Sequence, residues 1–395
     1  MRYTATRIKS SACDFAACLY DVNPTMTTRS AGLSSPAGDD RVRSRAGDAS
    51  SGARHTISNL RRAILGSPDI SFRAGRLMRL PWTALCAITT IALASGHSAR
   101  AQQADIVFAC GRGGTNNVCV MNSSGENIRQ LTFDTATTVE NLTPRWSPHH
   151  QKIAFHRRSE TGSDIYTMDA DGSHLRKVTS SDHTTLYRNV AWSPDGLRLA
   201  MECGTTTASD ICVAAADGTN LRKLTDASRA GGSSGSPDWS PDGSRIAFQS
   251  NRNGQPFGPR GFRSFDVYVM NAAGSNIRRL TTTLPGRTTE SPAWSPDGQR
   301  ILVVSTRDAE SMLTGWQLYV MRPDGTSMQQ LTRDSVRFAF GHPRWSPDGR
   351  SFVFHSNRDG TKNLVSEVEL YVIGSDGKNM RRLTRNDVYD GFADW

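Results

Sequence analysis

One stretch of the sequence carries the residue types of a nucleophilic catalyst. Residues 231–235 read Gly-Gly-Ser-Ser-Gly and match the nucleophile elbow, where a sharp strand-to-helix turn exposes a serine hydroxyl. Here the pattern lies in a Ser/Gly-rich loop, and no helical period follows it. The seven histidines after residue 102 show no His-Glu-x-x-His or other metal-ligand spacing. We therefore expect neither a catalytic residue nor a metal site.

Four cysteines have the spacing for covalent cross-links. Cys110 and Cys119 stand in "FACGRGGTNNVCVM", and Cys203 and Cys212 stand at the same positions in "MECGTTTASDICVA". Each pair falls on two consecutive predicted strands, and facing residues of antiparallel neighbours are about 4.5–5.5 Å apart, within disulfide range. We predict the disulfides Cys110–Cys119 and Cys203–Cys212, with buried free thiols as the alternative.

A repeat explains where these residues stand. "WSPDG" begins at Trp192, Trp239, Trp294 and Trp345, "WSPHH" begins at Trp146, and the last residue is Trp395. Between tryptophans, 46 to 55 residues apart, each unit holds short runs rich in Val, Ile, Phe and Tyr, bounded by Gly, Pro, Asp and Asn turns. These runs predict four strands: A ending at Trp, then B, C and D. Four antiparallel strands per repeat are typical of a propeller blade.

The two ends of the repeat region complement each other. The unit at residues 105–132 starts directly at strand B, whereas residues 388–395 supply a strand A with nothing after it. The sequence therefore predicts an all-β, six-bladed propeller over residues 102–395. Its last blade is closed by a C-terminal strand A that pairs with N-terminal strands B–D. An open solenoid is the alternative.

Strand direction places the loops on two faces. The A–B and C–D turns are short and uniform, whereas the B–C and D–A loops on the other face vary. Long loops on a rigid scaffold are frequent binding elements, and aromatic and Arg residues are typical interface anchors. We predict a binding surface in the B–C loops at residues 251–265, 307–315 and 357–367, with a solvated insertion as the alternative. Its candidate residues are Phe257, Arg260, Phe262, Arg263 and Trp316.

The D–A segments reach the centre of the ring just before each tryptophan. They contribute a mixed set of charged and polar residues to the expected channel mouth: Glu140, Tyr187, Arg188, Glu290, His342 and Asp390. Such a set suits a small polar ligand or a cation such as calcium, and it equally suits an ordinary solvated mouth. We predict no obligatory cofactor.

The leader differs from the repeats. Residues 1–101 carry a net +8 of the total +10, so the remainder is nearly neutral, which argues against nucleic-acid binding. Residues 1–77 are rich in Ser, Ala, Arg and Gly and are expected to be disordered, and Met78 is a candidate true start. Residues 78–101 have the basic flank, apolar centre and Ala-x-Ala end of a signal peptide cleaved after Ala101. We expect an exported protein with no transmembrane segment in the mature chain.

The unit "WSPDG…IAF.S…RRLT" resembles the TolB-type β-propeller repeat of exported bacterial proteins. The resemblance covers about residues 104–395 and implies a propeller fold. It says less about function, because the same repeat occurs in propellers attached to peptidases and in lone exported ones. The α/β domain that precedes the propeller in TolB has no counterpart between the signal segment and the repeats.

These observations favour an exported, monomeric, non-catalytic scaffold that binds an envelope or extracellular protein through its B–C/D–A loop face. The alternative is a lyase or hydrolase acting on a saccharide or peptide at the channel mouth. An acidic residue, a His and an Arg converging there would favour the enzyme.

Overall fold

The structure, a computed structural model, covers the repeat region. It describes residues 106–395 except residues 183, 231, 255, 258–261, 309–314, 334–339 and 360–367. The expected disordered leader (1–77) and signal peptide (78–101) lie outside the described residues and stay predictions.

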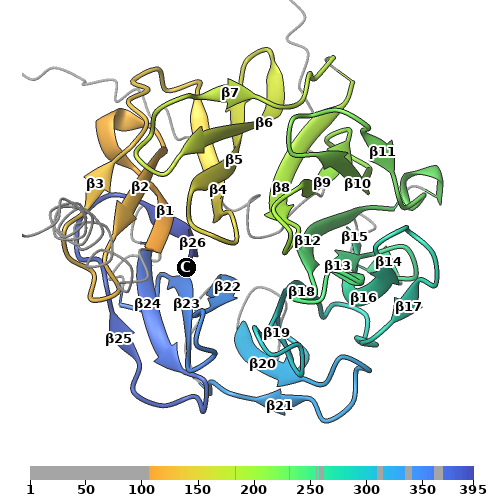
Figure 1. The fold of residues 1–395 in the computed structure, drawn as a ribbon. Helices are drawn as coiled ribbons and strands as arrows, with labels where there is room; N and C mark the ends of the chain where they lie inside the picture. Colours follow the sequence, from red (N-terminus) through yellow and green to blue (C-terminus); the bar gives the residue numbers. More distant parts are fainter. Residues whose placement is uncertain are drawn as a thin grey trace, which may run out of the picture. The chain divides into compact units, whose positions relative to one another are not determined.

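Six four-stranded antiparallel sheets make up this region (Figure 1). Blade 1 is β4 (Glu140–Trp146), β5 (Lys152–Ser159), β6 (Gly162–Asp169) and β7 (Arg176–Lys177). Blade 2 is β8 (Leu186–Trp192), β9 (Arg198–Gly204), β10 (Ser209–Ala215) and β11 (Arg222–Lys223). Blade 3 is β12 (Ser234–Trp239), β13 (Arg245–Ser250), β16 (Asp266–Asn271) and β17 (Arg278–Arg279). Blade 4 is β18 (Thr289–Trp294), β19 (Ile301–Ser305), β20 (Gln317–Met321) and β21 (Gln329–Gln330). Blade 5 is β22 (Phe340–Trp345), β23 (Ser351–Ser356), β24 (Glu369–Gly374) and β25 (Arg381–Arg382).

Blade 6 combines strands from both ends of the repeat region. Its order is β26 (Asp390–Asp394), β1 (Ile106–Cys110), β2 (Asn117–Met121) and β3 (Arg129–Gln130), and β26 runs antiparallel to β1. The remaining elements are a small hairpin, β14 (Pro256–Phe257) with β15 (Phe262–Arg263), and the 3-10 turns η2 (Arg112–Gly114) and η3 (Ser228–Ala230). The predicted all-β, six-bladed propeller is confirmed.

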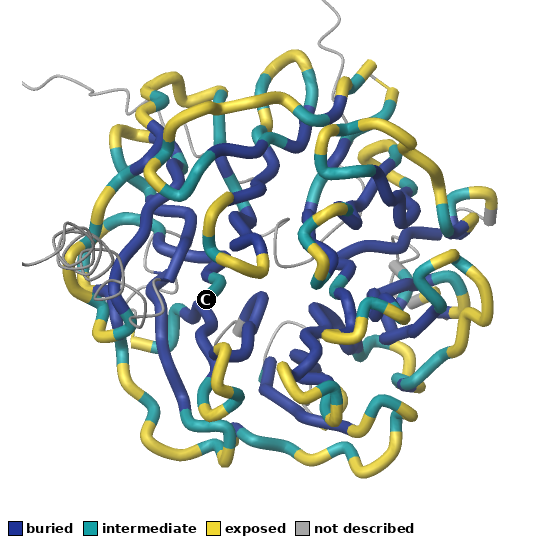
Figure 2. The backbone as a smooth tube through the Cα atoms, in the orientation of Figure 1, coloured by how far each residue is buried: buried dark blue, intermediate teal, exposed yellow. Residues whose placement is uncertain are grey.

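The innermost strands form a ring. β4, β8, β12, β18, β22 and β26 each contact the next, including β26 with β4. Each blade is therefore covered on both faces, which explains why strands B and C are continuous apolar runs, such as the fully buried β1. Hydrophobic clusters join neighbouring blades, and Figure 2 shows buried strands with exposed turns between them.

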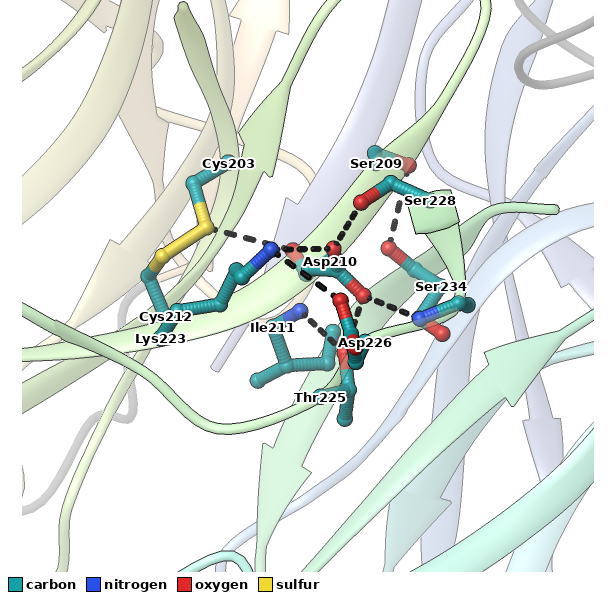
Figure 3. The surroundings of a disulfide bond; sticks show 11 residues. Cys203, Ser209, Asp210, Ile211, Cys212, Lys223, Thr225, Asp226, Ser228 and Ser234 are labelled. Carbon is teal, nitrogen blue, oxygen red and sulfur yellow. Dashed lines mark hydrogen bonds and ion pairs between the residues drawn. A yellow bond between two sulfur atoms is a disulfide. The ribbon is translucent and has the colours of Figure 1, made fainter. Parts of the chain in front are cut away.

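The Leu-Thr at the end of each repeat has a structural cause. In blade 2 the Thr225 hydroxyl donates to Asp210 Oδ1 (2.7 Å) and accepts from the Ile211 N–H (2.9 Å), which ties strand D to strand C (Figure 3). The same N–H to threonine bond recurs in the other five blades: Val118–Thr132, Ile165–Thr179, Val267–Thr281, Leu318–Thr332 and Leu370–Thr384. Because strand D has only two paired residues, this side-chain bond fixes its position.

The repeated tryptophan joins one blade to the next. The Trp345 indole N–H donates to the Ala293 carbonyl of the preceding blade (3.1 Å), and the Arg300 guanidinium lies 4.5 Å from the Trp345 ring centre. The equivalent cation–π contacts are Arg198 on Trp239 and Arg245 on Trp294.

Both predicted disulfides are present. The Cα atoms of Cys110 and Cys119 are 5.9 Å apart, and those of Cys203 and Cys212 are 5.8 Å apart. The cysteines are diagonal neighbours and not directly facing ones, since Cys110 pairs with Asn117 in the strand register. Each bridge nevertheless joins strands B and C of one blade, as predicted.

Candidate functional site

The B–C connection of blade 3 contains a short antiparallel strand pair, β14 with β15. Phe257 pairs with Phe262 between β14 and β15, and Arg263, which ends the hairpin, is half-buried. Arg260 lies outside the described residues, as do the side chains of the two phenylalanines. The predicted loop is therefore a short β-hairpin that stands on the B–C/D–A loop face.

The base of this hairpin is anchored in the blade. Asn251 and Phe265 are 7% and 8% exposed, and the Phe265 N–H donates to Thr288 Oγ1 (3.2 Å). Gly254 lies so close to Ser264 that a side chain at Gly254 would collide with the Ser264 backbone. The two ends of the insertion thus meet at a fixed neck.

Trp316 occupies a different environment from the one expected for a surface anchor. It is 6% exposed and packs with Leu318 and Phe354 in the cluster between blades 4 and 5. In the sequence, Trp316 stands next to a long loop, and nothing there distinguishes a buried ring from an exposed one. The Trp316 ring is therefore part of the packing between blades 4 and 5.

The predicted mouth residues are bonded to neighbouring strands. Arg188 Nη2 donates to Glu202 Oε1 (2.7 Å), and Asn189 Nδ2 donates to Glu202 Oε2 (2.9 Å). Glu140 Oε1 accepts from Asn116 Nδ2 (3.1 Å), and Glu140 also pairs with a half-exposed arginine of β5. These contacts hold strand A against strand B in blade 2 and join blade 1 to the B–C connection of blade 6.

Three further mouth residues lie deeper than expected. Tyr187, Glu290 and Asp390 are 7%, 3% and 0% exposed. Glu290 Oε1 accepts from Thr288 Oγ1 (2.5 Å), and Asp390 Oδ2 accepts from Asn386 Nδ2 (2.7 Å). Burial raises the pKa of Asp390 to about 6 and also raises the pKa of Tyr187.

His342 marks a feature that recurs in every inner strand. Three positions before each tryptophan, the chain adopts a positive φ: Thr143, Asn189, Ser236, Ser291, His342 and Phe392. The register shifts at this point in each inner strand, as in β22 between Gly341 and Arg344. This is a bulge, and it reverses which side chains face the axis.

A row of polar residues on strand B bonds to this bulge. Gln249 Oε1 accepts from the Ser291 N–H of the next blade (2.9 Å). His355 Nδ1 accepts from the Phe392 N–H in the same way (3.2 Å), while Thr143 Oγ1 bonds His156 Nδ1 within its own blade (2.8 Å). Sequence reasoning missed this row. Its signal is a polar residue directly after three apolar residues of strand B, as in "IAFH", "LAME", "IAFQ" and "FVFH".

The histidines of this layer are neutral because they are buried. Burial lowers the pKa of His156 and of His355 to about 3, and it lowers the pKa of His342 well below its usual value, with His355 as the next cause. His342 stacks on His355 (5.7 Å between ring centres) and meets the edge of Phe392 (4.7 Å). Neutral imidazoles can accept hydrogen bonds from backbone N–H groups, which is what His355 does.

A charged layer follows one position before the tryptophans. Four blades contribute to it: Arg145, Asp238, Arg344 and Asp394. Asp394 Oδ2 accepts from the Trp146 N–H (2.9 Å), and Asp238 Oδ2 accepts from the Trp294 N–H (2.7 Å). Burial lowers the pKa of Arg145 to about 9, and the charge of Arg344 adds to the effect. Charges of both signs thus meet around the axis.

These contacts bear on the chemistry that the site can perform. Arg188 is committed to Glu202, and His342 is buried against other rings, so the six predicted mouth residues do not converge as an acid–His–Arg cluster. Among the described residues, no three His, Cys, Asp or Glu side chains are grouped to hold a metal ion. In that part of the chain, no helix has the length and apolarity to span a membrane.

Comparisons with known proteins agree with this geometry. The sequence model of the TolB beta propeller domain matches residues 142–288 and 283–395. The uncharacterized peptidase YuxL of Bacillus subtilis is 28% identical over 168 residues, which are 35% of this chain and 24% of that protein. The chain therefore spans about a quarter of the length of this relative.

Solved structures share the fold at low sequence identity. TolB from Acinetobacter baumannii superposes with a TM-score of 0.58 at 17% identity, covering 80% of this chain and 74% of that one. A putative TolB from Agrobacterium tumefaciens gives a TM-score of 0.52 at 23% identity, covering 73% and 90%. The family match extends over more than half of this chain and agrees with the six observed blades. The chain therefore belongs to the TolB beta propeller family.

Proposed function

We propose that this protein is an exported, non-catalytic scaffold of the cell envelope that binds a protein partner through its B–C/D–A loop face. The observation that carries the proposal is the β14–β15 strand pair in the B–C connection of blade 3, whose two ends meet at Gly254 and Ser264. A structured loop loses less conformational entropy on binding than a free loop does. By contrast, the B–C connection of blade 1 is a tight turn of residues 160–161 between β5 and β6.

Two features support export. The disulfides join strands in two blades, and such bonds persist in oxidising compartments outside the cytosol. The signal-peptide pattern of residues 78–101 agrees with this location. A binding role also agrees with the contacts of the polar groups near the axis, because these groups form hydrogen bonds that join one strand or blade to the next.

The test replaces the hairpin and leaves its neck in place. Residues 255–263 are exchanged for Asn-Gly, a two-residue turn, while Gly254 and Ser264 are kept. The matched control is Glu160→Gln, which alters an exposed residue of a short B–C turn on the same face. Both variants and the parent are used to capture partners from an envelope fraction.

We expect the hairpin replacement to lose the captured partner and to keep the melting temperature within a few degrees, while Glu160→Gln retains both. Unchanged capture after replacement would contradict a binding role for the hairpin. Turnover of an oligosaccharide or peptide by the purified parent protein would favour the lyase or hydrolase alternative over a scaffold.

A further inference from the structure

A pocket of about 700 Å³ lies between blades 3 and 4, on the face of the A–B and C–D turns. Four arginines line it: Arg245, Arg278, Arg300 and Arg322. They come from the start of β13, the start of β17, the A–B turn of blade 4 and the C–D turn of blade 4. Asp324 is the carboxylate in the lining. This pocket, called here the arginine pocket, is on the opposite face from the β14–β15 hairpin.

None of the four guanidinium groups forms a salt bridge with a described carboxylate, but Arg245, Arg300 and Arg322 interact over a longer distance with Asp242, Asp297 and Asp324, respectively. Arg245 and Arg300 lie over tryptophan rings at 4.6 and 4.5 Å, and Arg322 is exposed. Arg278 donates to two backbone carbonyls of the blade 4 turn at 2.8 and 3.1 Å. The aromatic and carbonyl contacts orient these groups and leave their net charge in place.

The nearby carboxylates are occupied by their own turns. Asp324 Oδ1 accepts from the Thr326 hydroxyl (2.6 Å) and the Thr326 N–H (2.9 Å). Asp242 and Asp297, each near one pocket arginine, accept from serine hydroxyls of the A–B turns at 2.5 Å. These hydrogen bonds orient the carboxylates and leave their negative charges in place, so the four arginines exceed the three carboxylates by one positive charge.

Comparison of the six blades shows that this arrangement is specific to one junction. The residue that begins the C–D turn is Arg322 in blade 4; the other blades have Asn122, Asp169, Ala215, Asn271 and Gly374. In blade 1 the equivalent Asp169 pairs with Lys152 at 2.6 Å, so charge there is balanced within the blade. Arg322 therefore adds a cation where the repeat does not require one.

We propose that the arginine pocket binds a phosphate-type oxyanion. Guanidinium groups donate paired N–H bonds to oxyanions, and a phosphate group offers several acceptor oxygens to the arginines that line this pocket. The volume admits a phosphate together with part of the molecule that carries it. The source is either a free phosphorylated solute or the headgroup of an anionic phospholipid, which share this chemistry.

The first arm of the test uses inorganic phosphate. The melting temperature and the calorimetric binding isotherm are measured in phosphate and in chloride at equal ionic strength, for the parent, Arg322→Asn and Arg350→Asn. Asn is the residue that blade 3 carries at the equivalent position, so Arg322→Asn is compatible with the turn. Arg350→Asn removes the same charge from an exposed position on the blade 5 turn and is the matched control.

The second arm uses vesicles of phosphatidylglycerol and phosphatidylcholine in a sedimentation assay. We expect Arg322→Asn to weaken binding at least about 10-fold in one arm, the loss typical of a charge-assisted contact, and Arg350→Asn to weaken it less than about 2-fold. Loss in the phosphate arm supports a free solute, and loss confined to the vesicle arm supports a headgroup.

Two results would overturn the proposal. One is equal weakening by both variants, which would show that only general surface charge matters. The other is no binding by the parent protein in either arm. The hairpin replacement at residues 255–263 should leave anion binding unchanged, so failure of the scaffold proposal and failure of this one are separate outcomes.

Discussion

Replacing His355 by Gln tests whether the polar row on strand B is buried and uncharged and bonds to the bulges of the inner strands. His355 is 1% exposed, and its Nδ1 accepts the Phe392 N–H of the next blade. Gln249 performs the same task in blade 3 through its Oε1 atom. His355→Gln should therefore keep the bond between blades and remove a titrating group.

The magnitude follows from the pKa of His355, which burial lowers to about 3 in the folded state. In the unfolded chain the pKa is about 6.5, so between these values the unfolded state binds the proton and acid destabilises the fold. From pH 7.5 to pH 5.0 this single histidine should cost about 2 kcal/mol of unfolding free energy. His355→Gln should not lose this unfolding free energy, because an amide does not titrate in this range.

The assay is urea unfolding at pH 7.5 and pH 5.0, followed by tryptophan fluorescence. The free-energy loss on acidification should be about 2 kcal/mol smaller for His355→Gln than for the parent protein. His149→Gln, which changes an exposed histidine of the A–B turn of blade 1, is the control and should match the parent. Equal acid losses in parent and His355→Gln would refute the claim that His355 is buried and neutral.

Three further predictions concern other parts of the ring. Burial raises the pKa of Asp390 to about 6, so stability is lost as pH rises through this value; Asp390→Asn should gain about 1 kcal/mol relative to the parent between pH 5 and pH 8, measured by urea unfolding. Removal of residues 388–395 deletes β26 and Trp395, so the shortened protein should be protease-sensitive and aggregate, and a late cooperative melt would contradict the closed ring. Replacing both Cys203 and Cys212 by Ala should lower the unfolding free energy by about 3 kcal/mol relative to the oxidised parent and by clearly less relative to the reduced parent, where only the packing of the two buried sulfur atoms is lost.

The blade architecture was predictable because each unit repeats the same turn and strand sequences. "SPDG" makes a tight turn in which the Ser295 hydroxyl bonds Asp297 and Gly298 adopts a positive φ. Because apolar runs of five or six residues lie between such turns, the length and position of each strand are largely fixed. The disulfides followed from the same register, since two blades carry cysteines at equivalent positions.

The axial layer was not predictable from strand alternation. The bulge falls on residues such as Thr143 and Ser291, which carry no glycine signal for a positive φ. Beyond the bulge the facing of side chains is reversed, so counting back from the tryptophan misplaces the inward residues. Glu290 and Asp390 were predicted at the channel mouth, and the structure buries both. Their burial depends on packing between blades, which one repeat does not reveal.

The arginine pocket could not be predicted from the sequence for a related reason. Arg245 and Arg300 occupy a repeat position whose task is to stack on a tryptophan, so they look structural in the sequence. Only the ring brings Arg278 of one blade beside Arg322 of the next. Contacts across a blade junction require the twist between blades, which the sequence does not encode locally.

The composite sixth blade has a consequence for the order of synthesis. β1, β2 and β3 leave the ribosome first, whereas their inner partner β26 emerges after all five other blades. At common translation speeds this interval lasts roughly tens of seconds, during which the inner edge of β1 has no strand to pair with. The Cys110–Cys119 bridge joins β1 to β2 without any contribution from β26. In an oxidising compartment this bridge can therefore form before β26 pairs, so that the strands that receive the last strand are already cross-linked when the ring closes.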